Sequence, residues 1–105
     1  MITNKSTATS QIETLLLYYY DTCPFCKMTL QVLQETQLNV ELRHIHKQPL
    51  YRTELIKQGG NAQVPCLRIN LTDGQTTWLY ESRDIIHFMR SYADEIKPNH
   101  NAASA

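Results

Sequence analysis

The alternation of apolar and polar positions predicts four strands along the chain. Residues 14–20 form a continuous apolar run rich in aromatic side chains, which is typical of a central strand covered on both faces. Three shorter segments have the composition of further strands, at residues 40–45, 64–71 and 76–80. The Asp73-Gly74 pair lies between the last two and favours a tight hairpin turn. We therefore expect these last two strands to be antiparallel neighbours.

Apolar positions at helical spacing predict three helices between these strands. The first runs from Cys23 to a break at residues 37–39, the second over about residues 50–58, and the third over residues 83–96. Their starts carry cap-type or first-turn residues: Asp21, Thr22 and Pro24, then Pro49, then Ser82. The apolar stripe of the first helix is predicted to be Met28, Leu30, Val32 and Leu33. Gly59-Gly60 is expected to end the second helix.

The resulting element order is βαβαββα. Its first half is a βαβ unit, which requires parallel strands and a right-handed crossover. The prediction is an α/β fold with a four-stranded mixed sheet flanked by helices. We expect one domain over residues 13–96, with a flexible arm at residues 1–12 and a flexible tail at residues 97–105.

Composition restricts the partners of this domain. The chain has 105 residues with ten basic and ten acidic side chains, so its formal net charge is zero. This balance argues against a nucleic-acid or anionic membrane partner, because both favour a basic surface. No apolar run approaches the roughly 20 residues that span a bilayer, and the polar start of the chain does not resemble a signal peptide. We expect a monomer in the cytoplasm, where thiols remain reduced.

The segment Cys23-Pro24-Phe25-Cys26 is the strongest chemical signal in the chain. Cys23 is predicted to lie at the start of a helix, where unpaired N–H groups and the helix dipole favour the thiolate. Because the thiolate is the nucleophile in disulfide exchange, Cys23 is the candidate nucleophile and Cys26, one turn later, the candidate resolving thiol. Phe25 offers an apolar lip to a substrate, and Tyr20 is expected to line the substrate groove.

A metal site is the main alternative for these thiols. Structural zinc usually takes four ligands, often from two such cysteine pairs. This chain has one pair, one further cysteine (Cys66) and the His44/His46 pair. We therefore favour redox chemistry with no metal. We expect Cys66 to be buried filler and the two histidines to lie on a solvated strand face.

Three motifs in order give the chain a resemblance to the glutaredoxins. They are Cys23-Pro24-Phe25-Cys26, Val64-Pro65 and the run from Tyr80 to Ile85. The resemblance covers about residues 13–96 and implies a thioredoxin-like fold. It also implies a glutathione-dependent thiol–disulfide oxidoreductase that acts on protein disulfides and glutathione mixed disulfides. Glutathione would be a co-substrate, and no cofactor would be bound permanently.

The same resemblance implies a glutathione site. The Val64–Pro65 bond is expected to be cis, so that the backbone of Val64 can pair with the cysteinyl unit of glutathione. Ser82 and the free amides near it would hold the γ-glutamyl carboxylate, while Glu81 would pair with the ammonium group. Candidates for the cation or donor that meets the glycine carboxylate are Arg52, Lys57 and Gln63.

Two features look closer to the transferase-like glutaredoxins and the glutathione-transferase N-terminal domain. These are the Glu81-Ser82 pair and Tyr20, which stands where many small glutaredoxins have lysine. Such larger proteins carry a second, all-helical domain that we do not find in this chain. Two alternative functions therefore stay open: a glutathione-binding or iron–sulfur carrier module, and a glutathione-transferase-like domain.

Overall fold

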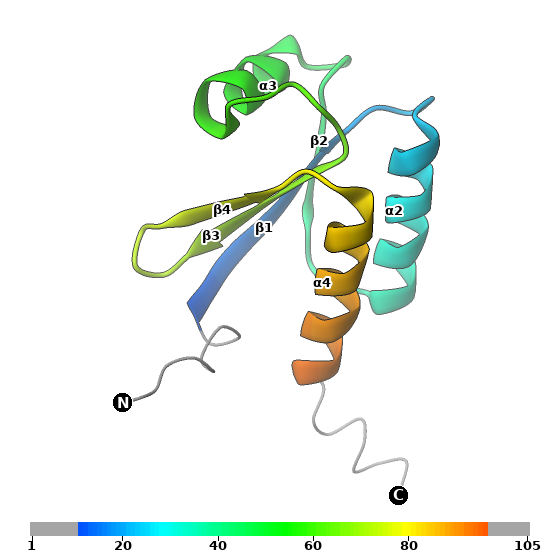
Figure 1. Cartoon of the computed structure of the whole chain (residues 1–105), viewed down its shortest axis with the longest axis vertical. Helices are drawn as coiled ribbons and strands as arrows, with labels where there is room; N and C mark the ends of the chain where they lie inside the picture. Colours follow the sequence, from blue (N-terminus) through cyan, green and yellow to red (C-terminus); the bar gives the residue numbers. More distant parts are fainter. Residues whose placement is uncertain (1–10, 97–105) are drawn as a thin grey trace, which may run out of the picture.

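A computed structural model describes residues 11–96 of the chain and shows one four-stranded sheet with helices on both sides (Figure 1). The elements in order are β1 (Ile12–Tyr19), α2 (Pro24–Thr36), β2 (Glu41–His44), α3 (Pro49–Glu54), the π-helical turn η2 (Leu55–Gly59), β3 (Cys66–Leu71), β4 (Thr76–Leu79) and α4 (Ser82–Glu95). This order confirms the predicted α/β class and the thioredoxin-like arrangement.

The sheet has the strand order β2-β1-β3-β4. β1 pairs with β2 in parallel and with β3 antiparallel, and β3 pairs antiparallel with β4. The hairpin turn between β3 and β4 contains Gly74 at a φ of 92°, a conformation that a glycine adopts without steric cost. β1 is therefore the central strand that its apolar sequence predicted.

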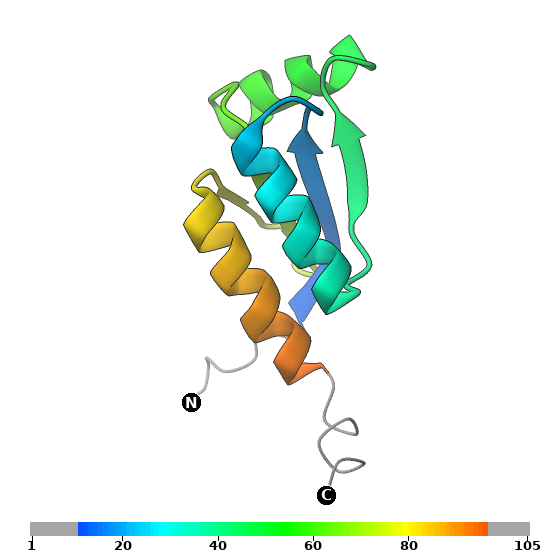
Figure 2. The ribbon, with the colours of Figure 1, turned by 90° about the vertical axis from the view of Figure 1, so that its right-hand side faces the viewer.

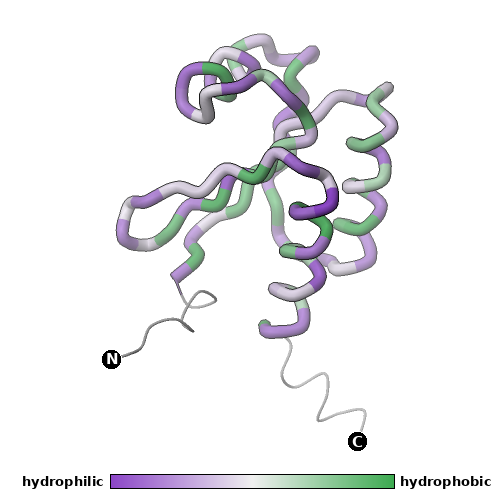
Figure 3. Tube along the Cα trace, viewed as in Figure 1, coloured by the Kyte–Doolittle hydropathy of each residue, from purple (hydrophilic) through white to green (hydrophobic). Residues whose placement is uncertain are grey.

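Helices α2 and α4 pack together over one face of the sheet (Figure 2). This face is aliphatic, and its buried residues are Leu15, Leu17, Val32, Leu38, Leu67, Ile69, Ile85, Met89 and Ala93. Hydrophobic and hydrophilic positions alternate along both helices (Figure 3), as expected for helices with one buried side. The two helices are thus held by apolar burial. Both begin at the end of the sheet where β1 ends.

The other face of the sheet is covered by α3 and η2 and has a polar centre. Its buried residues are Leu16, Tyr18, Ile45, Leu55 and Cys66. The Tyr18 hydroxyl donates to Glu54 Oε1 at 3.0 Å and accepts from Arg68 Nη1 at 3.1 Å. Arg43 pairs with Glu54 in the same cluster. Burial, together with the nearby Glu54 carboxylate, raises the pKa of Tyr18, which keeps the phenol in its donating form.

Some details differ from the sequence-based expectations. β1 begins at Ile12, inside the predicted arm, while residues 1–10 and 97–105 lie outside the described residues. Met28 was expected in the apolar stripe of the first helix but is 46% exposed, because the buried side of α2 instead includes Cys26, Thr29, Val32 and Thr36. The second helix ends in a π-helical turn, closed by Gly60 in the left-handed conformation. None of the helices between residues 11 and 96 has both the length and the apolar character needed to cross a membrane.

Candidate functional site

Three chain segments meet at the carboxyl end of β1. The loop after β1 leads into α2, and the antiparallel pairing of Tyr18 with Cys66 brings the start of β3 to the same end. β4 runs back to this end, since Leu79 pairs with Leu67, and α4 begins directly afterwards. The sheet register therefore gathers the predicted cysteine, proline and serine motifs in one region.

Cys23 is the N-cap residue of α2. Its Sγ accepts a hydrogen bond from the backbone N–H of Cys26 at 3.3 Å, which satisfies one of the free amides at the helix start. The sulfur is thus held at the positive end of the helix dipole, facing the free amides of the first turn. Asp21 and Thr22, which the sequence suggested as cap residues, are instead exposed in the preceding turn. Only 6% of Cys23 is exposed, so little of the residue is open to solvent.

Cys26 lies in the first turn of α2 and is fully buried. Burial raises the pKa of its thiol to about 12; contact with Cys23 acts in the same direction, and a hydrogen bond with the Tyr20 backbone opposes it. The Cys26 thiol is therefore protonated at neutral pH. As predicted, it is less accessible than Cys23. All three cysteines of the chain are free and buried.

A small hollow of about 120 Å³ opens beside the start of α2. It is lined by Phe25, Gln63, Val64, Pro65, Tyr80, Glu81 and Ser82. The Val64–Pro65 peptide bond is cis, as the resemblance implied. Phe25 is 57% exposed and gives the hollow an apolar side. Backbone groups, a hydroxyl and a carboxylate thus converge on one cavity next to Cys23.

Five of the six residues predicted to bind glutathione line this hollow: Phe25, Val64, Pro65, Glu81 and Ser82. Tyr20 does not line it, because its half-buried ring stacks on His46 with the centroids 4.4 Å apart. Ser82 is the first residue of α4 rather than its cap; Glu81 takes the extended N-cap conformation, and no side-chain capping bond forms. Of the three candidates for the glycine carboxylate, Gln63 lines the hollow, whereas Arg52 and Lys57 do not.

Sequence reasoning missed the contribution of Tyr80 to this hollow. The Tyr80 hydroxyl donates to the backbone oxygen of Asn61 at 3.1 Å, while Gln63 Nε2 donates to the backbone oxygen of Tyr80 at the same distance. These two bonds tie the loop before Pro65 to the end of β4. The sequence signal was weak, because a tyrosine after a short strand is as typical of core packing as of a loop anchor.

Cys66 follows the cis-proline and lies on the α3 side of the sheet. It is fully buried, and burial raises the pKa of its thiol to about 12, partly opposed by the Tyr80 hydroxyl. Burial and protonation both make a thiol unreactive. The expectation that Cys66 fills space in the core agrees with this position.

The expectation of a solvated histidine pair is wrong for His44. Its side chain is only 11% exposed, and its Nε2 lies 3.0 Å from Asp21 Oδ2. His46 is exposed as expected. Within residues 11–96, no three His, Cys, Asp or Glu side chains gather as a potential metal site.

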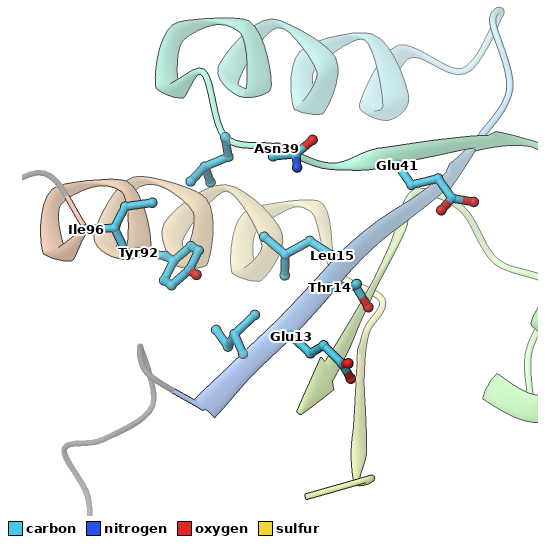
Figure 4. Close-up of a pocket in the computed structure, with 9 residues that line it drawn as sticks. Glu13, Thr14, Leu15, Asn39, Glu41, Tyr92 and Ile96 are labelled. Carbon is cyan, nitrogen blue, oxygen red and sulfur yellow. The ribbon is translucent and has the colours of Figure 1, made fainter. Parts of the chain in front are cut away.

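A larger hollow of about 410 Å³ lies at the opposite end of β1 (Figure 4). Its labelled lining residues come from β1, from the start of β2 and the segment before it, and from the end of α4; they include Glu13, Asn39, Glu41 and Tyr92. No cysteine or histidine lines it. This hollow lies beside the first residues of β1, whereas the cysteine motif follows the last residues of that strand.

The chain matches the family model described as "Glutathione S-transferase, N-terminal domain" over residues 17–97. The chain belongs to this family. The earlier resemblance to the glutathione-transferase N-terminal domain is thereby confirmed. A search of curated proteins found no match.

Solved structures with this fold include glutathione S-transferase-like and thioredoxin-like proteins. Maleylacetoacetate isomerase from Anaeromyxobacter dehalogenans 2CP-1, solved with bound dicarboxyethyl glutathione and citrate, is 26% identical with a TM-score of 0.60. The match covers 84% of this chain and 40% of the isomerase, so this family member spans about two fifths of that relative's length. The same isomerase was also solved with glutathione in its active site.

Two further structures share the fold at lower identity. The thioredoxin-like protein BC3987 is 18% identical, with a TM-score of 0.56 over 69% of this chain and 94% of that protein. The C-terminal domain of DsbD from Neisseria meningitidis, in its reduced form, is also 18% identical, with a TM-score of 0.51 over 75% of this chain and 79% of that domain. These likenesses establish the thioredoxin-like fold.

Proposed function

We propose that this chain is a glutathione-dependent thiol–disulfide oxidoreductase whose working domain is residues 13–96. The observation that carries the proposal is the position of Cys23 as the N-cap of α2, beside the hollow formed by the cis-proline loop and the start of α4. A nucleophilic sulfur and a set of peptide-binding groups are thus neighbours. The glutathione bound by the related isomerase supports glutathione as the ligand of this hollow.

In the first step, the Cys23 thiolate attacks the glutathione sulfur of a mixed disulfide. The substrate thiolate leaves and takes up a proton, and Cys23 becomes joined to glutathione by a new S–S bond. The thiolate of a second glutathione then attacks the bound glutathione sulfur, releasing oxidised glutathione and regenerating the Cys23 thiolate. One glutathione is consumed for each mixed disulfide reduced: its sulfur joins the glutathionyl sulfur taken from the substrate, giving one oxidised glutathione and one free substrate thiol.

Protein disulfides require a second route through Cys26. Cys23 attacks the protein disulfide, and Cys26 then loses its proton and attacks the Cys23 sulfur, which frees the substrate and leaves a Cys23–Cys26 disulfide. Because burial raises the pKa of Cys26, little of this thiol is in the reactive thiolate form at neutral pH, and the resolving step accelerates as the pH rises. The proposal therefore favours glutathione mixed disulfides as the main substrates.

Glutathione is placed in the hollow by the residues that line it. The backbone of Val64 pairs with the cysteinyl unit, as an added strand would. Ser82 and the free amides at the start of α4 hold the γ-glutamyl carboxylate, and Glu81 pairs with the ammonium group. Gln63 lines the same hollow and donates to the glycine carboxylate. Phe25 covers the apolar side of the bound tripeptide.

The test is the reduction of a glutathionylated peptide by glutathione, with three single variants measured beside the wild type. Cys23→Ser should lower the rate by at least about 100-fold, because the nucleophile is removed. Cys26→Ser should retain at least about half of the activity, since the resolving thiol is not needed for this substrate. Cys66→Ser is the matched control and should retain full activity. Equal losses in the Cys23 and Cys26 variants would contradict the proposed route.

The family itself favours a second candidate, a glutathione-transferase-like domain that binds glutathione without redox turnover. The isomerase chain is about two and a half times as long as its matched region. Conjugation of glutathione to an aryl halide by the wild type, with no reduction of the glutathionylated peptide, would favour this candidate over the oxidoreductase.

A further inference from the structure

The loop that carries the nucleophile is tied to the end of β2 by two histidines. Tyr19 packs edge-on against His44, with ring centroids 5.0 Å apart and an interplanar angle of 64°. Tyr20 stacks on His46 at 4.4 Å. Asp21 then places its Oδ2 3.0 Å from His44 Nε2. Each of three consecutive residues before Thr22 and Cys23 therefore contacts one of these imidazoles.

The parallel register of the two strands explains this contact. Tyr19 is the register partner of His44, so the last residues of β1 and β2 lie side by side. The backbone N–H of Ile45 donates to the Tyr19 oxygen at 2.9 Å, which extends the pairing past the end of β2. Because the chain turns at both places, the turn after β2 lies against the nucleophile loop.

The hydrogen bonds of His44 fix its tautomer. Its Nδ1 accepts from the backbone N–H groups of His46 at 3.3 Å and Lys47 at 3.1 Å. A nitrogen that accepts hydrogen bonds carries no proton, so the ring proton of neutral His44 must lie on Nε2. The donor side of the ring therefore faces Asp21, and the acceptor side holds the turn after β2.

His44 Nε2 is shielded from solvent, and Asp21 is the one carboxylate in contact with it among residues 11–96. The two atoms are within hydrogen-bond distance but not aligned for a hydrogen bond in this conformation. A buried donor left without a partner is costly, and Asp21 is exposed enough to rotate into line. Proximity to His44 also lowers the pKa of Asp21, which is therefore an anion near neutral pH.

We propose that His44 is a positioning residue that holds the loop of the Cys23 nucleophile by pairing its buried Nε2–H with Asp21. This inference rests on the proposed function for its catalytic consequence, while the contact itself belongs to the fold. Asp21 precedes the N-cap by two residues, so anchoring its side chain restricts the backbone that leads into Cys23. A fixed nucleophile spends more time in the orientation needed for attack.

His44, His46 and Asp21 do not line the hollow assigned to glutathione. A loss of the His44–Asp21 contact should therefore slow the attack by Cys23 without weakening glutathione binding. The expected signature is a lower kcat/KM for the glutathionylated peptide, which Cys23 attacks, with an unchanged kcat/KM for glutathione, which enters only in the second step. A variant that merely destabilised the fold would not produce this split.

The experiment compares His44→Asn, Asp21→Ala and their double variant with the wild type. An asparagine oxygen can take the place of Nδ1 and hold the turn after β2, but its side chain is too short to donate to Asp21. His87→Asn is the matched control, because His87 is exposed on α4. Two readouts are used: steady-state reduction of a glutathionylated peptide, and hydrogen exchange of the backbone amides of residues 21–26 in the full chain.

We expect each single variant to lower kcat/KM for the glutathionylated peptide roughly tenfold at constant kcat/KM for glutathione. Each should also speed amide exchange in residues 21–26 but not at Leu17. The double variant should be no slower than either single variant, because both remove the same contact. Additive losses, or a His44→Asn effect no larger than that of His87→Asn, would overturn the inference. If the wild type has no reductase activity, the proposed function fails, and amide exchange still decides whether the contact holds the loop.

Discussion

The two faces of the sheet are held to their helices by different kinds of interaction. Along β1, Leu15 and Leu17 point to the face under α2 and α4, whereas Leu16 and Tyr18 point to the face under α3. The first face is an aliphatic core. The second contains a buried phenol that is hydrogen-bonded to Glu54 and Arg68.

This difference matches the elements that each face holds in place, which are α2 and α4 on one side and α3 on the other. Apolar burial has no preferred direction. It holds α2 and α4 against the sheet without involving Cys23, the N-cap of α2, or Ser82, the first residue of α4. Hydrogen bonds depend on direction and distance. The polar face can therefore hold α3 in one position relative to the sheet. Helix α3 leads through η2 into the cis-proline loop.

Replacing Leu17 by alanine should have the largest effect on stability. Leu17 is fully buried in the aliphatic face, and a Leu→Ala change in a core typically costs about 2–5 kcal/mol of unfolding free energy. Urea unfolding followed by circular dichroism measures this loss. A loss below about 1 kcal/mol would mean that this face can collapse around the missing side chain.

Replacing Tyr18 by phenylalanine tests the other face at the neighbouring position. The ring is kept, but Glu54 and Arg68 each lose a buried partner, which should cost about 1–3 kcal/mol. The same urea titration gives the value. An unchanged midpoint would show that Glu54 and Arg43, which already pair, satisfy the cluster without the phenol.

Alkaline pH should weaken the polar face through Cys66. Its folded-state pKa is raised from 9.0 to about 12, so the folded state keeps a proton that the unfolded state releases. Stability from this group is complete below about pH 9 and falls as the pH rises towards about 12. Near pH 10 the loss should be about 1.4 kcal/mol.

The comparison that isolates this term is Cys66→Ala against the wild type, with unfolding measured from neutral pH to about pH 10. The alanine variant should lose less stability over this range, because it lacks the titrating thiol. Parallel curves for the two proteins would contradict the assignment. Cys26 is unchanged in both proteins, so its own titration cancels.

The smallest effect is expected for a contact between the two helices at the surface. Arg90 on α4 lies 3.5 Å from Glu35 on α2, and both side chains are more than half exposed. Arg90→Ala should change the unfolding free energy by only about 0.2–1 kcal/mol. A larger loss would show that the aliphatic face depends on this ion pair as well as on apolar burial.

The element order could be predicted from the sequence because the spacing of apolar residues and the positions of turn-forming residues agreed along the chain. The aromatic run of β1, the Asp73-Gly74 turn and the Gly59-Gly60 stop each mark an element or a boundary independently of the others. The buried side of each helix was harder to predict. Met28 fits the apolar pattern of α2 but is largely exposed, because Thr29 and Cys26 take the buried positions instead.

The site was predictable where it consists of contiguous motifs. Cys23 and Cys26, the cis-proline pair and Glu81-Ser82 were each visible as short strings, and five of the six expected ligand residues line one hollow. The contacts that a strand register creates were not visible. His44 approaches Asp21 only because β1 and β2 are parallel with Tyr19 opposite His44, and no local pattern encodes that pairing.

The antiparallel pairing of Tyr18 with Cys66 has a consequence for the order of assembly. The cysteine motif and the proline loop lie far apart along the chain and become neighbours only when β3 docks beside β1. Contacts between such distant segments form late in folding, since a long loop must close first. A nascent chain that has reached α3 would already contain Cys23 and Cys26, but it would lack the proline loop and the start of α4 that form the hollow beside them.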